Sequence, residues 1–210
     1  MTKQACKWMV RALLIVIGPG LLGFSIAGMF YSGLGSDPTS VLVDGLHMRT
    51  SIAQGSASNI VNVALLVLLV LLNRKKVGVA TLTSAFAVGP GITLGQQLIF
   101  NHLPAPGLPV ALLVSVLAVL LNSFGLGLYL CADLGASAFD GLILLIKDKT
   151  GLSYKNALRV FYAVVLVIGM LLGGVWGVGT VLSLLLGGPA FQFFYRVCAD
   201  WAAKWLLVKS

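Results

Sequence analysis

Charged residues are scarce in this chain. Asp, Glu, Lys and Arg make up only 10% of its 210 residues, whereas hydrophobic residues make up 59%. A soluble globule of this size needs far more polar surface, so the composition excludes an aqueous domain and predicts a membrane protein. The net charge of +8 would suggest nucleic-acid binding in a soluble protein, but in a membrane protein it is typical of basic cytoplasmic loops. Nucleic acid is therefore not an expected partner.

Residue groups that carry chemistry are also sparse. Cys6, Cys131 and Cys198 have no metal-ligand spacing and lie in or beside apolar stretches, so we interpret them as small hydrophobic residues. His47 and His102 stand apart. No metalloprotease motif, activated nucleophile, phosphate-binding loop or carboxylate pair is present. We therefore expect neither an enzyme nor a metal or cofactor site.

The chain instead contains an internal repeat. A stretch from Leu34 to Pro90 recurs about a hundred residues later in the same order, with a register slip of one residue that a loop deletion explains. The matching pieces are Leu34-Gly35 with Leu134-Gly135, apolar runs 60–72 and 160–172, residues 78–81 with 177–180, Ser84 with Ser183, and Gly89-Pro90 with Gly188-Pro189. The repeat predicts two similar halves, at about 8–101 and 109–199, within a single transmembrane domain of residues 1–210.

Hydropathy predicts six membrane spans. Each is long and apolar enough to cross a bilayer, and they lie at about residues 12–31, 56–72, 77–100, 110–131, 156–172 and 177–197. Short helices should follow the first and fourth spans, capped by Ser36 or Asp37 before Pro38, and by Ser137 with Asp140. Residues 200–210 suit a short interfacial helix.

The basic residues fix an orientation. With six spans and a cytoplasmic amino terminus, every Lys and Arg except Arg49 lies on the cytoplasmic side, and both termini are cytoplasmic. Each half then holds three spans, so the second half must enter the membrane from the opposite side. The halves are predicted to be inverted repeats whose third and sixth spans are interrupted by Gly and Pro. This pattern is typical of transporters and channels.

The same residues support a family resemblance. The segment Leu34-Gly35-Ser36-Asp37-Pro38 precedes a short helix, and Thr50, Gly55 and Gly89-Pro90 follow. This order resembles the YczE/YitT group of bacterial inner-membrane proteins over nearly the whole chain. That group commonly has Trp and then Asp after the proline, where this chain has Thr39 and Ser40, although the second half keeps Asp140. The resemblance implies a polytopic protein of the bacterial inner membrane, of a kind often regarded as a transporter.

The Gly-Pro segments are the first candidate site. Proline removes a helical hydrogen bond, and a true break would start new half-helices after Pro90 and Pro189 whose free N–H groups attract an anionic or strongly polar group. A simple kink for helix packing is the alternative. The residues assigned to this site are Gly89, Pro90, Gly91, Thr93, Gly188, Pro189 and Gln192.

Further polar residues could line the interface between the halves. Thr81, Ser84, Thr180 and Ser183 precede the two Gly-Pro segments, although small residues and hydroxyls also serve plain helix packing. Asn59 and Asn62 share one face of the second span and should point inward. Asp37 and Asp140 are candidates for coupling-ion sites, and helix capping explains both equally well.

These features favour a small secondary transporter, or a channel-like permease, for a small polar or anionic organic solute. Two alternatives stay open: a substrate-binding membrane subunit of an ATP-driven uptake system, and a lipid-handling or accessory membrane protein. The expected partners are membrane lipid and the solute, with a homodimer or a partner membrane protein as further options.

Overall fold

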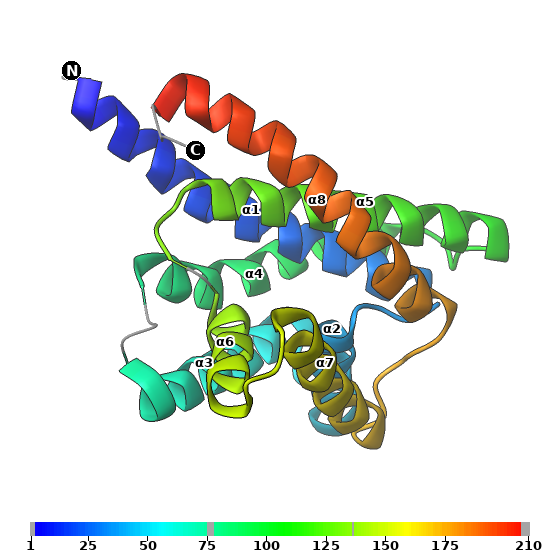
Figure 1. Ribbon diagram of the computed structural model, residues 1–210. Coiled ribbons are helices and arrows are strands. Elements are labelled where there is room, and N and C mark those ends of the chain that lie inside the picture. The colour runs from blue at the N-terminus through cyan, green and yellow to red at the C-terminus, as the bar shows by residue number, and fades with distance from the viewer. Residues whose placement is uncertain (1–2, 75–77, 136, 207–210) are drawn as a thin grey trace.

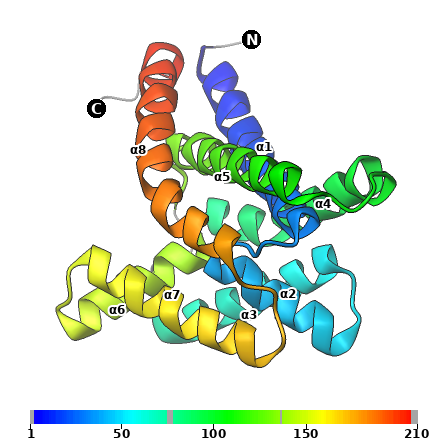
Figure 2. The ribbon, with the colours of Figure 1, turned by 90° about the vertical axis from the view of Figure 1, so that its right-hand side faces the viewer.

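The structure is a computed structural model that describes residues 3–74, 78–135 and 137–206, and within these residues it contains helices, turns and loops but no strand. The predicted all-α fold is confirmed. Figure 1 and Figure 2 show two layers of helices, one formed by α1, α4, α5 and α8 and the other by α2, α3, α6 and α7. Each layer therefore takes helices from both sequence halves.

The element order follows the repeat. The first half contains α1 (Lys3–Ser32), α2 (Pro38–Thr50), α3 (Gln54–Asn73) and α4 (Val79–Leu98), followed by a short 3-10 helix, η2 (Phe100–His102). The second half contains α5 (Leu108–Cys131), α6 (Ala138–Thr150), α7 (Tyr154–Leu171) and α8 (Val178–Leu206). The helices of each half thus match in order, and the two short helices α2 and α6 have the same length of 13 residues.

The short helices form where the capping residues predict them. Asp37 caps α2 by accepting backbone hydrogen bonds from Thr39 and Ser40, with Pro38 in the first turn. Ser137 caps α6, because its hydroxyl oxygen accepts the N–H of Asp140 at 3.2 Å and the hydroxyl donates to the Asp140 carboxylate at 2.8 Å. Both helices carry buried residues and pack against neighbouring helices. They are therefore integral parts of the helical assembly.

Among the described residues, five helices are long and apolar enough to cross a membrane, namely α1, α3, α5, α7 and α8. The fourth helix, α4, is not among them. It contains Gly89, Pro90 and Gly91 and ends with Thr93, Gly95 and two glutamines, and these residues lower its hydropathy. The chain is thus a membrane protein with several apolar helices, and the sixth span stays a prediction.

The predicted interruptions of the third and sixth spans do not form. α4 remains helical through Pro90, and α8 remains helical through Pro189. A proline removes one helical hydrogen bond, and in a membrane helix packing and side-chain hydroxyls can offset that loss. In α4 the Thr93 hydroxyl donates to the Gly89 carbonyl at 3.2 Å, which gives this turn an additional hydrogen bond.

The predicted separate helix at 200–210 is also wrong. α8 continues without interruption to Leu206, because no glycine or proline lies between residues 190 and 206 to end it. Residues 207–210 lie outside the described residues.

Candidate functional site

The two glycines of the α4 Gly-Pro segment are buried between two neighbouring helices, whereas Pro90 between them is exposed. A Cβ atom at Gly89 would overlap the Asn59 side chain and the Gly55 carbonyl of α3. On the opposite side, a Cβ atom at Gly91 would overlap the Gly20 carbonyl of α1 and lie 3.1 Å from Gly23 Cα. Both glycines thus allow α4 to approach α1 and α3 closely, which is the role that small residues have in membrane helix packing.

The matching segment of α8 has different surroundings. A Cβ atom at Gly188 would meet no atom within 4 Å, and Gly188, Pro189 and Gln192 are all exposed. The structure therefore does not bring the two Gly-Pro segments together into one site. Since neither helix breaks, no new helix starts at Gly91 or at Ala190, and the predicted anion-binding N–H groups remain within helices.

The loops between the first and second helices of each half make reciprocal contacts with the other half. The Gly179 N–H of α8 donates to the Leu34 carbonyl at 2.8 Å, and the Ala80 N–H of α4 donates to the Leu134 carbonyl at 3.3 Å. The Leu-Gly loop of each half thus lies against the first turn of the last helix in the other half. The sequence repeat gives no indication of this exchange, because it matches segments without saying which ones touch.

The predicted hydroxyl residues lie at these two helix starts. Thr81 Oγ1 accepts the Gly78 N–H at 3.0 Å, and Thr180 Oγ1 accepts the Gly177 N–H at 3.3 Å. One turn further, Ser84 and Ser183 donate to the carbonyls of these two threonines, at 3.1 and 2.8 Å. Both halves therefore repeat the same local hydrogen-bond pattern, in which the threonines cap the helices.

The two asparagines of α3 are oriented differently. Asn62 is buried, and its Nδ2 donates to the Ser58 carbonyl at 2.8 Å. Asn59 places its Oδ1 over Gly89 of α4, where that oxygen is buried and has no hydrogen-bond partner. The amide of Asn59 thus offers a free acceptor beside the Gly-Pro segment.

The two acidic candidates lie at helix starts, where Asp37 caps α2 and Asp140 stands in the first turn of α6 behind its cap Ser137. Asp37 receives hydrogen bonds from the Thr39 and Ser40 hydroxyls as well as from their backbone N–H groups. Asp140 receives the Ser137 hydroxyl at 2.8 Å and the Tyr154 hydroxyl at 3.3 Å. Their structural role is therefore visible, whereas a role in ion coupling stays a prediction.

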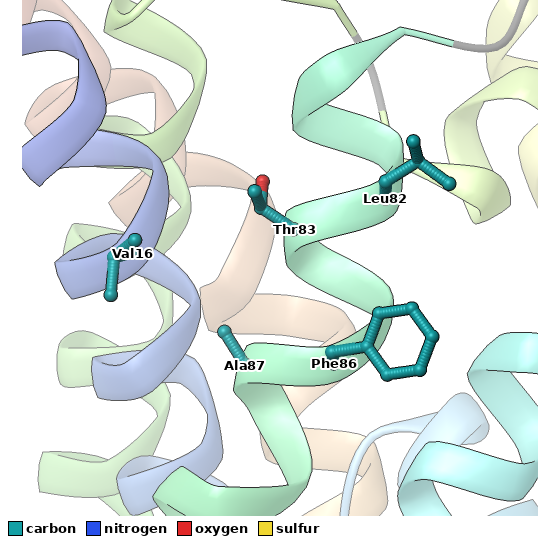
Figure 3. Close-up of a pocket in the computed structure, with 5 residues that line it drawn as sticks. All are labelled: Val16, Leu82, Thr83, Phe86 and Ala87. Atoms are coloured by element: carbon teal, nitrogen blue, oxygen red, sulfur yellow. The ribbon is translucent and has the colours of Figure 1, made fainter.

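Two hollows differ sharply in chemistry. The larger, of about 390 Å³, is an open apolar groove in which Thr83 and Ala87 of α4 point towards Val16 of α1 (Figure 3). In a membrane such a surface faces acyl chains. The smaller, of about 110 Å³, has a mainly apolar lining that also contains the polar residues Ser36, Asp44 and Gln54. It is the better candidate for specific recognition, because a binding site needs a few polar groups that orient the ligand.

Asp44 is a site residue that the sequence analysis missed. It lies in α2 with only 4% of its surface exposed. Its two carboxylate oxygens accept the Gln54 side-chain amide at 2.7 Å and the Val175 N–H at 2.9 Å. Gln54 in turn accepts a hydrogen bond from Gln96 at the end of α4. The available signal was an acidic residue between Val43 and Gly45 within a short predicted helix.

Cys131 and Cys198 are buried in one hydrophobic cluster between α5 and α8, and both are free thiols. The side chain of Cys6 lies outside the described residues. No group of three or more His, Cys, Asp or Glu side chains able to hold a metal occurs in the part of the chain that the structure describes.

Comparison with known proteins places the chain in a family. Residues 9–196 match the family of unknown function DUF6198. The chain is 30% identical over 181 residues to the uncharacterized protein YyaS of Bacillus subtilis (strain 168), covering 86% of this chain and 90% of that protein. It is 29% identical over 186 residues to an uncharacterized protein of Haemophilus influenzae (strain ATCC 51907 / DSM 11121 / KW20 / Rd), covering 89% and 84%.

A shorter match connects the chain to a membrane protein. Over 83 residues it is 34% identical to the uncharacterized membrane protein YczE of Bacillus subtilis (strain 168), covering 40% of this chain and 39% of that protein. No solved structure matches the chain. The resemblance to YczE inferred from the Leu-Gly and Gly-Pro motifs is thereby confirmed, and the chain belongs to the DUF6198 family of YczE-like membrane proteins.

Proposed function

We propose that the protein is a small secondary transporter, or a channel-like permease, that moves a small polar organic solute across the cytoplasmic membrane of a bacterium. In this proposal α1, α3, α4, α5, α7 and α8 cross the membrane, and both termini are cytoplasmic. The two halves are inverted repeats, and the solute path lies between them. No chemical conversion of the solute is proposed.

The reciprocal docking of the two Leu-Gly loops is the observation that carries this proposal. The Leu34 carbonyl receives Gly179, and the Leu134 carbonyl receives Ala80. Exchange of equivalent contacts between two halves is what a pseudo-twofold axis generates. Transporters with inverted repeats move one half against the other around such an axis and hold their solute near it.

The directions of the helices support the same axis. In Figure 1, α1 and α5 run side by side in opposite directions, and α4 and α8 also run in opposite directions. The short helices cross between the halves, because α2 packs on α7 and α6 packs on α3. Corresponding helices that run antiparallel are the expected result of an inverted repeat, whereas parallel halves would keep one direction.

The unbroken helices remove the reason to expect an anionic solute. An anionic preference rested on free N–H groups after Pro90 and Pro189, and these remain within helices. Apart from the Asp44 carboxylate, the buried polar groups that remain as candidates are hydroxyls and amides, with Ser84 and the unpartnered Asn59 oxygen among them. These groups fit a polar solute that exchanges hydrogen bonds, and they do not select for a negative charge.

A counterflow measurement tests the proposal. Purified protein is first screened by thermal shift against small polar organic solutes of positive, negative and zero charge. Any solute that raises the melting temperature is then supplied as a radiolabel to proteoliposomes that contain the same solute unlabelled. We expect saturable accumulation without ATP. Ser84→Ala should raise the KM, because Ser84 lies buried in α4, and should preserve folding, because its hydroxyl donates to the Thr81 carbonyl one turn away within the same helix.

Thr83→Val is the matched control. Thr83 lies in the same helix and likewise bonds carbonyls within one turn, but it lines the lipid-facing groove. Thr83→Val should leave transport unchanged.

Absence of any transported solute would contradict the proposal. Co-purification of an ATPase would then favour a binding subunit of an uptake system, and a changed activity of a partner enzyme would favour an accessory protein. Membrane lipid is the proposed partner of the exposed apolar faces, and a homodimer or a partner membrane protein stays a proposal.

A further inference from the structure

A cavity lies where five segments meet, and none of the residues assigned to the binding site from the sequence lines it. The end of α1, the loop that follows it, the short helix α2, the start of α3 and the loop between α7 and α8 enclose about 110 Å³. Its polar lining residues are Ser36, Asp44 and Gln54, and the others are glycines and apolar residues that include Met29, Phe30, Met48 and Val175. The cavity thus joins three helices and one loop of the first half to one loop of the second.

The carboxylate of Asp44 is the only acidic group that lines this cavity. It makes no ion pair with any residue that the structure describes, and it accepts hydrogen bonds from the Gln54 side chain and the Val175 N–H. A carboxylate offers about four acceptor positions, so about two remain open. A buried charge without a counter-ion is costly, and proteins normally pair it or let it bind a cation.

The Ser36 hydroxyl is a second and independent indication. Ser36 is only 2% exposed, and its Oγ has no hydrogen-bond partner. It lines the same cavity as Asp44. Buried hydroxyls in proteins nearly always have a partner, so an unpartnered hydroxyl in the same cavity as a carboxylate indicates a ligand that bonds to it.

The end of α1 adds negative potential. α1 ends at Ser32, and Phe30 in its last turn lines the cavity together with Gly33. The carbonyl groups of a last helical turn carry partial negative charge and favour cations. The nearest basic residues in α2, His47 and Arg49, lie in its last turn, and the His47 ring is hydrogen-bonded to the Ile52 carbonyl at 2.7 Å. Neither makes an ion pair with Asp44 in the described structure.

We propose that this cavity binds a small monovalent cation, either an alkali metal ion or a primary ammonium group, with Asp44 as the charged ligand and Ser36 as a neutral one. A single carboxylate among neutral oxygens suits one positive charge, whereas divalent sites usually gather more carboxylates. The volume corresponds to roughly three or four waters at about 30 Å³ each. A large organic cation is therefore excluded. The proposal concerns binding alone and does not depend on transport.

Thermal stability in different chloride salts tests it. Purified full-length protein in detergent is titrated with sodium, potassium, ammonium or methylammonium chloride, and N-methylglucammonium chloride keeps the ionic strength constant. We expect at least one small cation to raise the melting temperature with saturation, while N-methylglucammonium does not. Preference for sodium or potassium identifies a metal ion, and preference for ammonium or methylammonium identifies an ammonium group.

Variants connect the effect to the cavity. Asp44→Asn keeps the side-chain size and should abolish the saturable shift. Ser36→Ala removes one neutral ligand and should raise the apparent Kd roughly threefold to tenfold. Asp148→Asn, at an exposed position in the equivalent short helix α6, should leave the shift unchanged.

The outcomes are decisive in both directions. Equal melting temperatures of the unaltered protein in all salts would overturn the proposal, and so would a saturable shift that persists in Asp44→Asn. If Asp44→Asn fails to fold, the Ser36→Ala titration decides. A Kd unchanged by removal of the Ser36 hydroxyl would then contradict the site, and a raised Kd with an unchanged maximal shift would support it.

Discussion

Asp44 connects segments that are far apart in the chain. Its carboxylate accepts one hydrogen bond from Gln54, ten residues away, and one from Val175, 131 residues away. The sequence alone does not predict these contacts, since the two donors come from elements whose placement beside Asp44 depends on the whole fold. Asp37 is the opposite case. Its cap is local, and the order Asp37-Pro38 was enough to predict it.

Equivalent glycines in the two halves should respond differently to substitution. A Cβ atom at Gly89 overlaps Asn59 and Gly55, whereas one at Gly188 meets nothing within 4 Å. Gly89→Ala should therefore lower the free energy of unfolding by roughly 1–3 kcal/mol through overpacking. Gly188→Ala should be neutral or stabilise α8 by up to about 1 kcal/mol, the usual helix preference of Ala over Gly. Thermal unfolding in detergent measures both, and equal losses would contradict the packing described for α4.

The residues that follow the two short helices allow a pair of opposite substitutions. Ser51 after α2 has φ +59°, and Gly151 after α6 has φ +70°, so both positions adopt the left-handed conformation that glycine tolerates best. Ser51→Gly should raise the free energy of unfolding, and Gly151→Ser should lower it, each by about 1 kcal/mol. The same unfolding measurement applies. A loss of stability in Ser51→Gly would show that the serine side chain contributes more than the backbone conformation costs.

At the scale of whole elements, α4 and α8 show that a sequence pattern can predict where a helix lies without predicting whether it breaks. Both helices begin close to their predicted starts, although α8 continues beyond its predicted end to Leu206, and both contain the Gly-Pro pair that suggested a break. Whether proline breaks a membrane helix depends on groups supplied by neighbouring elements, and α4 has α1 and α3 on either side of its glycines. That environment cannot be inferred from one sequence. The matched positions of the two prolines therefore predicted that each half has a helix with a Gly-Pro pair. They did not predict whether the two pairs lie in one site.

The crossing of α2 and α7 gives a prediction for an element pair. A Cβ atom at Gly169 would lie 2.7 Å from the Leu42 backbone nitrogen, and one at Gly45 would lie 2.6 Å from the Gly169 carbonyl oxygen. Gly169→Ala should push the helices apart and lower the free energy of unfolding by about 1–3 kcal/mol. Gly20→Ala is the control, because its Cβ atom would meet nothing within 4 Å. Unfolding curves in detergent compare the two, and equal stability would show that the close crossing is not needed.

Across the whole molecule, the repeat predicted matched halves, and the matching helix order and hydrogen bonds agree with it. The sequence did not predict the exchange in which each Leu-Gly loop caps a helix of the other half, because such contacts depend on the relative placement of the halves. Hydropathy and the repeat disagree on the number of membrane spans. The repeat requires α4 to be a span, whereas α4 is too polar to count as one by its composition. If α4 crosses, each half has three spans and inversion follows; if it does not, the halves cannot be inverted.

Labelling on both sides of α4 tests inversion most directly. In a variant with Cys6, Cys131 and Cys198 replaced by alanine, single cysteines are placed at the exposed positions Arg74 and Ala105, which flank α4. Intact cells are treated with a membrane-impermeant maleimide, with and without permeabilisation of the inner membrane. We predict that Ala105→Cys is labelled in intact cells and that Arg74→Cys is labelled only after permeabilisation. Labelling of both positions from the same side would contradict a crossing α4 and, with it, the inverted arrangement of the two halves.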